Sequence, residues 1–94
     1  NVLGVHVEGN GGTAVATLTQ VQIANNSSHG VQAGGGLSTN PSVARLGDNA
    51  INNNGDFGVS IQANGSVETY LTNKIVGNTT DGCAGCSSIT TTLN

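Results

Sequence analysis

Residues 58–81 read GVSIQANGSVETYLTNKIVGNTTD, and the features of this stretch recur along the chain. The stretch opens with Gly-Val, turns at Asn-Gly, reaches a Leu, then a Val, then an Asn, and ends before the next Gly. The glycines that restart the pattern are Gly4, Gly30, Gly58 and Gly82, at spacings of 26, 28 and 24 residues. Such recurrence indicates a repeat architecture, in which each unit stacks on its neighbours.

Each restarting Gly precedes a short segment of alternating residues, such as Val5-His6-Val7 and Val59-Ser60-Ile61. Because successive side chains of a strand point to opposite faces, the first and third residues share one face. We expect these residues to point inward, and His6, Gln32 and Ser60 to point outward. The chain shows no helical periodicity, so the pattern predicts an all-β fold.

A second set of apolar residues recurs later in each unit. A Leu is followed five residues on by Ile or Val, which predicts a core ladder of Leu18, Leu46, Leu71, Ile23, Ile51 and Val76. If the units are coils stacked at the strand spacing of about 4.8 Å, equivalent side chains lie on top of one another. The pattern therefore predicts a parallel β-solenoid of about 3.5 coils, each of 24–28 residues.

Two residues after this Ile or Val stands an Asn, at Asn25, Asn53 and Asn78. Two interpretations remain open. Stacked amides can hydrogen-bond along a column, which would make these residues an asparagine ladder. Alternatively, Asn is selected at each corner only because it tolerates the left-handed backbone conformation of a turn.

Residues 1–94 form a single domain in this interpretation. Its coils cover approximately residues 4–29, 30–57 and 58–81, followed by a partial coil at 82–94. Both ends, NVLGV and ITTTLN, have strand-like sequences instead of caps, so we expect uncapped ends. Open strand edges recruit further strands, and a head-to-tail contact that does not close generates a filament.

The stretches GVSIQANGSVETYLTNKIVGNTTDG and QVQIANNSSHGVQAGG resemble the right-handed parallel β-helix repeat proteins of the pectate-lyase-like superfamily. The resemblance covers the chain from Gly4 to about Gly82 and rests on structural residues. It implies a right-handed coil. The superfamily includes polysaccharide lyases and hydrolases, phage tailspikes, surface proteins and adhesins, so it implies no single function.

The charge of the chain excludes some partners. Two basic residues, Arg45 and Lys74, stand against five carboxylates, for a net charge of −3. Nucleic-acid binding requires clustered basic residues, so we expect no nucleic-acid partner. No apolar run of 18 residues occurs, so we expect no membrane insertion. A polar composition with few charges is commoner outside cells, which predicts an extracellular or cell-surface location.

We find no catalytic constellation in the sequence and expect no enzymatic activity and no cofactor. The two histidines occupy unlike positions in the repeat, so a metal site with convergent ligands is not expected there. Asp56 and Asp81 both lie shortly before a restarting Gly and would stack on adjacent coils. They could hold Ca²⁺ together with backbone carbonyls, or be two solvated turn residues.

Cys83 and Cys86 stand in the incomplete last coil as Cys-Ala-Gly-Cys. A second such pair is missing, so a zinc site is not expected. A local disulfide between them would close the terminal turn and would fit a non-cytosolic location. Pairing between subunits, or free thiols, are the alternatives.

Two functions follow from these observations. The first is a structural, self-assembling extracellular β-solenoid subunit, whose terminal coils stack on copies of itself to build a fibre or surface scaffold. The alternative is a fragment of a polysaccharide-binding or polysaccharide-processing parallel β-helix protein, with glycans as partners of an outward strand face.

Overall fold

A computed structural model of the chain describes residues 2–70, 72–84 and 89–93, with only the backbone for Tyr70, residues 81–84 and residues 89–93. Every regular element in these residues is a β-strand. The first sheet contains β1 (Val5–Val7), β4 (Val31–Ala33), β7 (Phe57–Ile61) and β10 (Thr80–Ala84). The second contains β2 (Ala14–Thr19), β5 (Ser42–Gly47), β8 (Gly65–Tyr70) and β11 (Ile89–Leu93). The third contains β3 (Gln22–Ala24), β6 (Ala50–Asn52) and β9 (Lys74–Val76).

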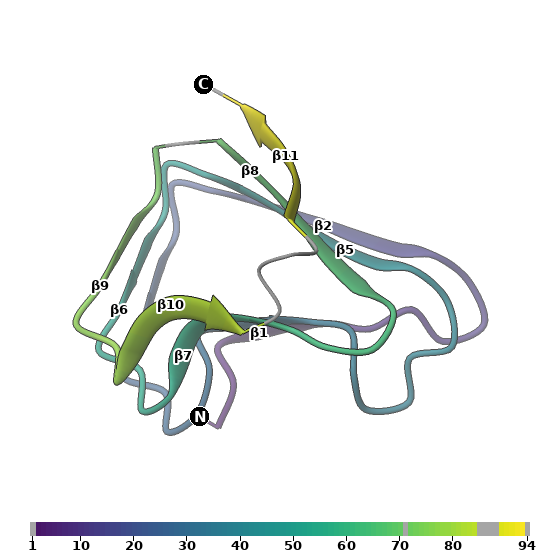
Figure 1. Cartoon of the computed structure of the whole chain (residues 1–94), viewed down its shortest axis with the longest axis horizontal. Helices are drawn as coiled ribbons and strands as arrows, with labels where there is room; N and C mark the ends of the chain where they lie inside the picture. The colour runs from purple at the N-terminus through teal and green to yellow at the C-terminus, as the bar shows by residue number, and fades with distance from the viewer. Residues whose placement is uncertain (1, 71, 85–88, 94) are drawn as a thin grey trace.

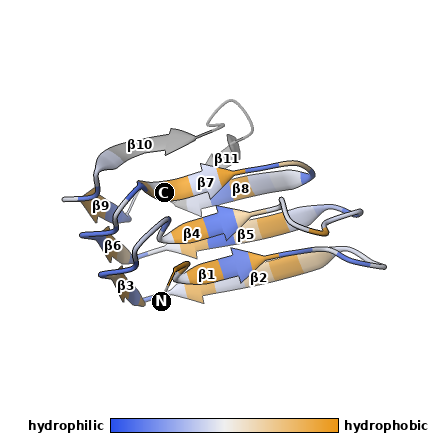
Figure 2. Ribbon diagram, turned by 90° about the horizontal axis from the view of Figure 1, so that it is seen from below, coloured by the Kyte–Doolittle hydropathy of each residue, from blue (hydrophilic) through white to orange (hydrophobic). Residues whose placement is uncertain are grey.

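Successive strands along the chain belong to the first, second and third sheets in turn, and this order repeats. Each strand pairs in parallel with the equivalent strand of the neighbouring repeat. Figure 1 looks along the stack and shows the successive strands of each sheet lying over one another. Figure 2 shows the same strands from the side as layers. We call β1–β3 coil 1, β4–β6 coil 2 and β7–β9 coil 3. The all-β architecture with stacked parallel strands therefore agrees with the solenoid-like arrangement that the repeat predicts.

Coils 1 and 2 stack in the register that the repeat predicts. Val5 pairs with Val31, Leu18 with Leu46, and Ile23 with Ile51. In β2 the burial of side chains alternates with a period of two, so Ala14, Ala16 and Leu18 face inward. The hydrophobic core is aliphatic: Val7, Ile23, Val31, Ala33, Ala44, Leu46, Ile51, Val59, Ile61 and Val67.

Coil 3 has a different register from the predicted one. Leu46 pairs with Thr69, not with Leu71, which itself lies outside the described residues. Ile51 pairs with Ile75, whereas Val76 pairs with Asn52 and is 51% exposed. The assignment of Val76 to the core ladder is therefore wrong, and Ile75 takes that place.

The physical reason is one additional residue at the corner between β8 and β9. Leu46 and Ile51 are five positions apart, but their partners Thr69 and Ile75 are six apart. An extra residue in an irregular corner leaves the hydrogen-bonding of the strands intact. A count along the sequence cannot detect it, because Leu71 offers a plausible match by residue type alone.

The restarting glycines are explained by close packing at the corner after the third sheet. A Cβ atom added at Gly30 would lie 2.6 Å from Ile51 Cγ2, and one added at Gly58 would lie 2.6 Å from Ile75 Cγ2. Both distances are too short for carbon atoms in contact. Only glycine lets the backbone of the first sheet approach the isoleucine column this closely.

Candidate functional site

The first strands of the three sheets form one end of the stack, which we call the N-terminal face. β1, β2 and β3 each have a hydrogen-bonded neighbour on one side only. Within the described residues, their other edge is not covered by a strand. Figure 2 shows these three strands as the terminal layer that carries the N-terminus.

Side chains at this face are less buried than their equivalents one coil further on. In coil 2, Val31 and Ala44 are fully buried and Leu46 is 1% exposed. Their partners Val5, Ala16 and Leu18 are only partly buried, although they pack against the same core. The N-terminal face is therefore an uncovered cross-section of the hydrophobic core.

A hollow of about 260 Å³ opens at the part of this face that belongs to the third sheet. Its lining is formed by Gly4, Val5, Val21, Gln22, Ile23, Ala24 and Asn26. Most of these residues are apolar, and Asn26 contributes an amide. Val21 is 37% exposed beside the hollow.

Asn26 is the first member of an asparagine ladder that crosses all three coils, with Asn54 and Asn78 above it. Asn54 Oδ1 accepts hydrogen bonds from the backbone N of Asn26 (3.1 Å) and from Asn26 Nδ2 (2.9 Å). Asn78 Oδ1 accepts from the backbone N of Asn54 (2.9 Å) and from Asn54 Nδ2 (2.7 Å). All three residues are at most 8% exposed, so these bonds satisfy groups that would be costly to bury alone.

Asn54 and Asn78 also donate to the coil below them. Asn54 Nδ2 lies 3.4 Å from the carbonyl oxygen of Ile23, and Asn78 Nδ2 lies 3.0 Å from that of Ile51. The amide of Asn54 therefore connects all three coils, and the stack is held by side-chain as well as backbone hydrogen bonds.

The ladder differs from the predicted one, Asn25, Asn53 and Asn78. Asn25 and Asn53 instead have positive φ angles of 63° and 57°, and the equivalent residue of coil 3 is Gly77, at 73°. For Asn25 and Asn53 the turn interpretation is therefore correct, and only Asn78 was assigned to its actual role. Each ladder residue follows an isoleucine of the third sheet by three positions, at Ile23–Asn26, Ile51–Asn54 and Ile75–Asn78, whereas the same spacing at Ile61–Asn64 ends in a turn.

A second, shorter ladder lies at the corner between the second and third sheets. Asn73 Oδ1 accepts hydrogen bonds from the backbone N and from Nδ2 of Asn49, each at 3.1 Å. Asn49 Oδ1 accepts from the backbone N of Val21 at 2.9 Å. Coil 1 therefore has Val21 where coils 2 and 3 have asparagine, so this ladder ends one coil before the N-terminal face.

The outward face of the first sheet carries a row of polar residues, as predicted for His6 and Gln32. His6 Nε2 lies 2.8 Å from the carbonyl oxygen of Gly34, and Gln32 Nε2 donates to the same oxygen at 3.1 Å. Glu8 Oε1 lies 3.8 Å from His6 Nδ1. Ser60 occupies the same row but is fully buried, with its hydroxyl accepting from Gln62 Nε2 at 2.7 Å.

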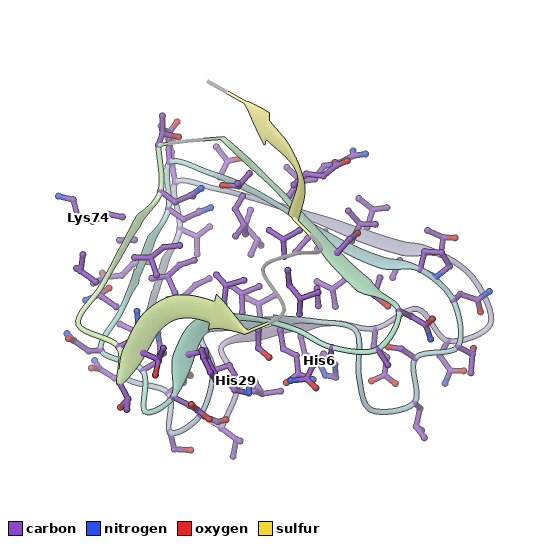
Figure 3. The ribbon with its side chains drawn as sticks, viewed as in Figure 1. His6, His29 and Lys74 are labelled. Carbon is purple, nitrogen blue, oxygen red and sulfur yellow. The ribbon has the colours of Figure 1, made fainter. Side chains whose placement is uncertain are left out.

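His29 lies along the same side of the coil outline as His6, whereas Lys74 projects from the third sheet (Figure 3). His29 Nδ1 is 3.9 Å from Asp56 Oδ2, and its ring stacks at a tilt on Phe57, with centroids 5.8 Å apart. Among the described residues, no group of three or more His, Cys, Asp or Glu could hold a metal ion. The side chain of Asp81, expected beside Asp56, lies outside the described part of the structure.

The terminal cysteines are described only in part. The backbone of Cys83 pairs with Val59, which is the position that the repeat predicts for it. Its side chain and the whole of Cys86 lie outside the described residues. The disulfide between Cys83 and Cys86 therefore stays a prediction.

Comparison with known proteins gives no relative. No family model, no curated protein and no solved structure matches this chain. In the described residues, no helix is long and apolar enough to cross a membrane. The chemistry of the N-terminal face is therefore the main source of functional information.

Proposed function

We propose that this chain is a structural module with the right-handed parallel β-helix fold, and that its N-terminal face stacks on another copy to build an extracellular fibre or surface scaffold. The residues that recur from coil to coil are core aliphatic residues, close-packed glycines and ladder asparagines. A structural role without catalysis accounts for this recurrence. The right-handed sense is supported by the strong preference of parallel strand connections for that hand.

One observation carries this proposal: Val5, Ala16 and Leu18 at the N-terminal face are only partly buried, whereas their partners one coil further on are at most 1% exposed. In a stacked repeat, stability comes from the contacts between neighbouring coils. A further coil placed on β1, β2 and β3 would bury Val5, Ala16 and Leu18 and would pair the free strand edges.

The charge distribution favours a copy of the same chain as the partner. Coil 1 contains Glu8 as its only carboxylate and no Lys or Arg. Glu8 stands on the outward side, beside His6. A nearly neutral apolar cross-section neither repels a second copy nor requires a partner of opposite charge. A head-to-tail contact of this kind does not close, so it produces a filament.

The proposal is tested by the size of the particles in solution. We expect the sedimentation coefficient to rise with protein concentration, and electron microscopy to show fibres with a strand spacing of about 4.8 Å along their axis. Val21→Lys places a charge at the N-terminal face and should abolish the assembly. Leu37→Lys, in the exposed turn of the middle coil, is the control and should not. A monomer at every concentration would refute the proposal.

A glycan-binding role is the second candidate, and the polar row on the first sheet favours it. His6, Gln32 and Glu8 present donors and acceptors side by side on one outward face. Calorimetric titration with neutral and uronic oligosaccharides, with and without Ca²⁺, tests this role. Binding that is lost in His6→Ala would support it over self-assembly.

A further inference from the structure

Three asparagines of the chain are followed directly by glycine: Asn10, Asn54 and Asn64. An Asn-Gly pair is chemically reactive, because glycine has no Cβ to hinder the attack of its own backbone nitrogen on the side-chain amide of the asparagine. The three pairs have the same two residues but lie in different surroundings. Their exposure and their hydrogen bonds therefore decide which of them can react in the folded protein.

Asn54 is held in the middle of the asparagine ladder and is 2% exposed. Its side chain bonds to Asn26, to Asn78 and to the carbonyl oxygen of Ile23. The backbone N of Gly55 donates to the carbonyl oxygen of Asn26 at 2.8 Å. The attacking nitrogen and the amide carbon cannot approach each other while these bonds persist, so the stacked coils protect this pair.

Asn64 has an exposed side chain, but both of the groups that would react are engaged. Asn64 Nδ2 donates to the carbonyl oxygen of Ser38 at 3.0 Å. The backbone N of Gly65 donates to the carbonyl oxygen of Gln62 at 2.9 Å, and Gly65 packs on the carbonyl of Ala33 with no room for a Cβ. This turn must therefore open before the pair can react.

Asn10 and Gly11 lie at the tip of the turn between β1 and β2, and both are exposed. Among the described residues, none bonds to the side chain of Asn10 or to the backbone N of Gly11. A Cβ added at Gly11 or Gly12 would meet no atom within 4 Å, although coil 2 is paired directly above. The tip therefore stands clear of the side of the stack, and in Figures 1 and 2 this turn reaches past the ends of the strands.

The base of this turn is fixed on both sides of the free tip. Gly9 is buried, and its carbonyl oxygen accepts from the backbone N of Thr39 (2.8 Å) and of Asn40 (3.0 Å). On the other side, the backbone N of Ala14 donates to the carbonyl oxygen of Pro41 at 3.0 Å. A chemical change confined to the tip would therefore leave the pairing of the strands intact.

We propose that Asn10 is the site at which the folded protein deamidates spontaneously, and that the fold protects Asn54 and Asn64 from the same reaction. The backbone nitrogen of Gly11 attacks Asn10 Cγ and forms a C–N bond. The Cγ–Nδ2 bond breaks, and Nδ2 leaves as ammonia with the proton of the attacking nitrogen. Water then opens the cyclic imide at one of its carbonyls and leaves aspartate or isoaspartate. Water is consumed and ammonia released, and no oxidant or reductant takes part.

The product carries a new carboxylate at position 10, and one negative charge added to −3 gives a net charge of −4. Isoaspartate also lengthens the backbone of the tip, which the free turn can absorb. The same reaction at Asn54 would remove the Nδ2 that donates to Asn78 and would place a carboxylate in a buried column. The fold therefore leaves reactive the position at which the product does not disturb the coils.

The test is incubation of the folded full chain in mildly alkaline buffer made with heavy-oxygen water, which labels each newly formed carboxyl group. Trypsin, added in ordinary water, cleaves after the two basic residues, so residues 1–45 contain Asn10 and residues 46–74 contain the other two sites. Electron-transfer fragmentation locates the label and distinguishes aspartate from isoaspartate. We expect Asn10 to acquire label at least about tenfold faster than Asn54 or Asn64, because those sites require local opening.

The same incubation in denaturing urea is the control. The three pairs then differ only in their flanking sequences, and we expect their rates to agree within about threefold. In the folded chain, Asn10→Gln should remove the fast labelling without changing the urea midpoint of unfolding. Equal rates at the three sites of the folded chain, or faster labelling at Asn54 or Asn64 than at Asn10, would show that the proposal is wrong.

Discussion

Coil 1 and coil 2 have the same three strands in the same register, but they differ in their neighbours. Coil 2 lies between two coils, and its inward side chains are buried to within 1%. Coil 1 has a described neighbour on one side; its Val5, Ala16 and Leu18 are only partly buried, and its Val7 and Ile23 are 5% exposed. The burial of a residue in this architecture therefore depends on the stacking of coils as well as on its own type, so equivalent substitutions should have unequal effects.

The largest difference is expected for the leucine pair. Leu46→Ala removes a side chain that is 1% exposed and should lower the free energy of unfolding by about 3 kcal/mol. Leu18→Ala removes the equivalent side chain at the N-terminal face and should cost roughly half as much, because water already reaches it. Urea unfolding at a concentration where the protein is monomeric measures both. Equal losses would show that coil 1 is covered in solution.

In the asparagine ladder too, a substitution in coil 2 should lower the free energy of unfolding more than the equivalent substitution in coil 1, but the difference should be smaller than for the leucines. Asn54→Ala breaks bonds to the coils above and below, whereas Asn26→Ala breaks bonds only to the coil above. We expect losses of about 2–3 kcal/mol for Asn54→Ala and about 1–2 kcal/mol for Asn26→Ala, since the buried partners lose their hydrogen bonds. Thermal unfolding followed by circular dichroism provides the measurement. Asn25→Ala, in the adjacent turn, would show how much of the loss is due to the backbone conformation.

A stabilising substitution would make the two coils more alike. Val21→Asn extends the shorter ladder, because the new amide can donate to Asn49 Oδ1, which already accepts from the backbone N at this position. Val21 is 37% exposed, so little apolar burial is lost. We expect a gain of about 0.5–1 kcal/mol in unfolding free energy. Combining Val21→Asn with Asn49→Ala should cancel the gain; its persistence would mean that the amide acts elsewhere.

The smallest effect is expected on the outer surface, where both coils face water. Arg45 Nε lies 2.6 Å from Glu68 Oε1 between coils 2 and 3, and coil 1 has Thr17 at the same position. Because the pair is largely solvated, a double-mutant cycle with Arg45→Ala and Glu68→Ala should give a coupling energy of about 0.2–1 kcal/mol that falls with added salt. A coupling energy that does not fall with added salt would contradict an ion pair between these side chains.

The repeat in the sequence was sufficient to predict the stacked parallel strands, because apolar residues must recur wherever a coil faces the interior. The repeat also predicted correctly that Leu18 pairs with Leu46 and Ile23 with Ile51, because the corner between these positions has the same length in coils 1 and 2. It failed in coil 3, where one additional corner residue shifts Thr69 and Ile75 into place.

The asparagine ladder was misplaced for a different reason. Asn25 and Asn26, like Asn53 and Asn54, are adjacent and identical in type, but one belongs to a left-handed turn and the other to a buried hydrogen-bonded column. Composition does not distinguish these roles. Their spacing from an isoleucine of the third sheet separates them, but the same spacing at Ile61–Asn64 belongs to a turn, so the strand to which the isoleucine belongs must also be known.

The turn between the first and second sheets differs in length from coil to coil, covering residues 8–13, 34–41 and 62–64. The strands on both sides keep their pairing in spite of this difference. In Figure 1 the longest of these turns projects away from the rest of the outline. Peptides inserted at residues 34–41 should therefore project from the side of the stacked strands and leave the strand pairing intact, which makes this corner a suitable grafting position.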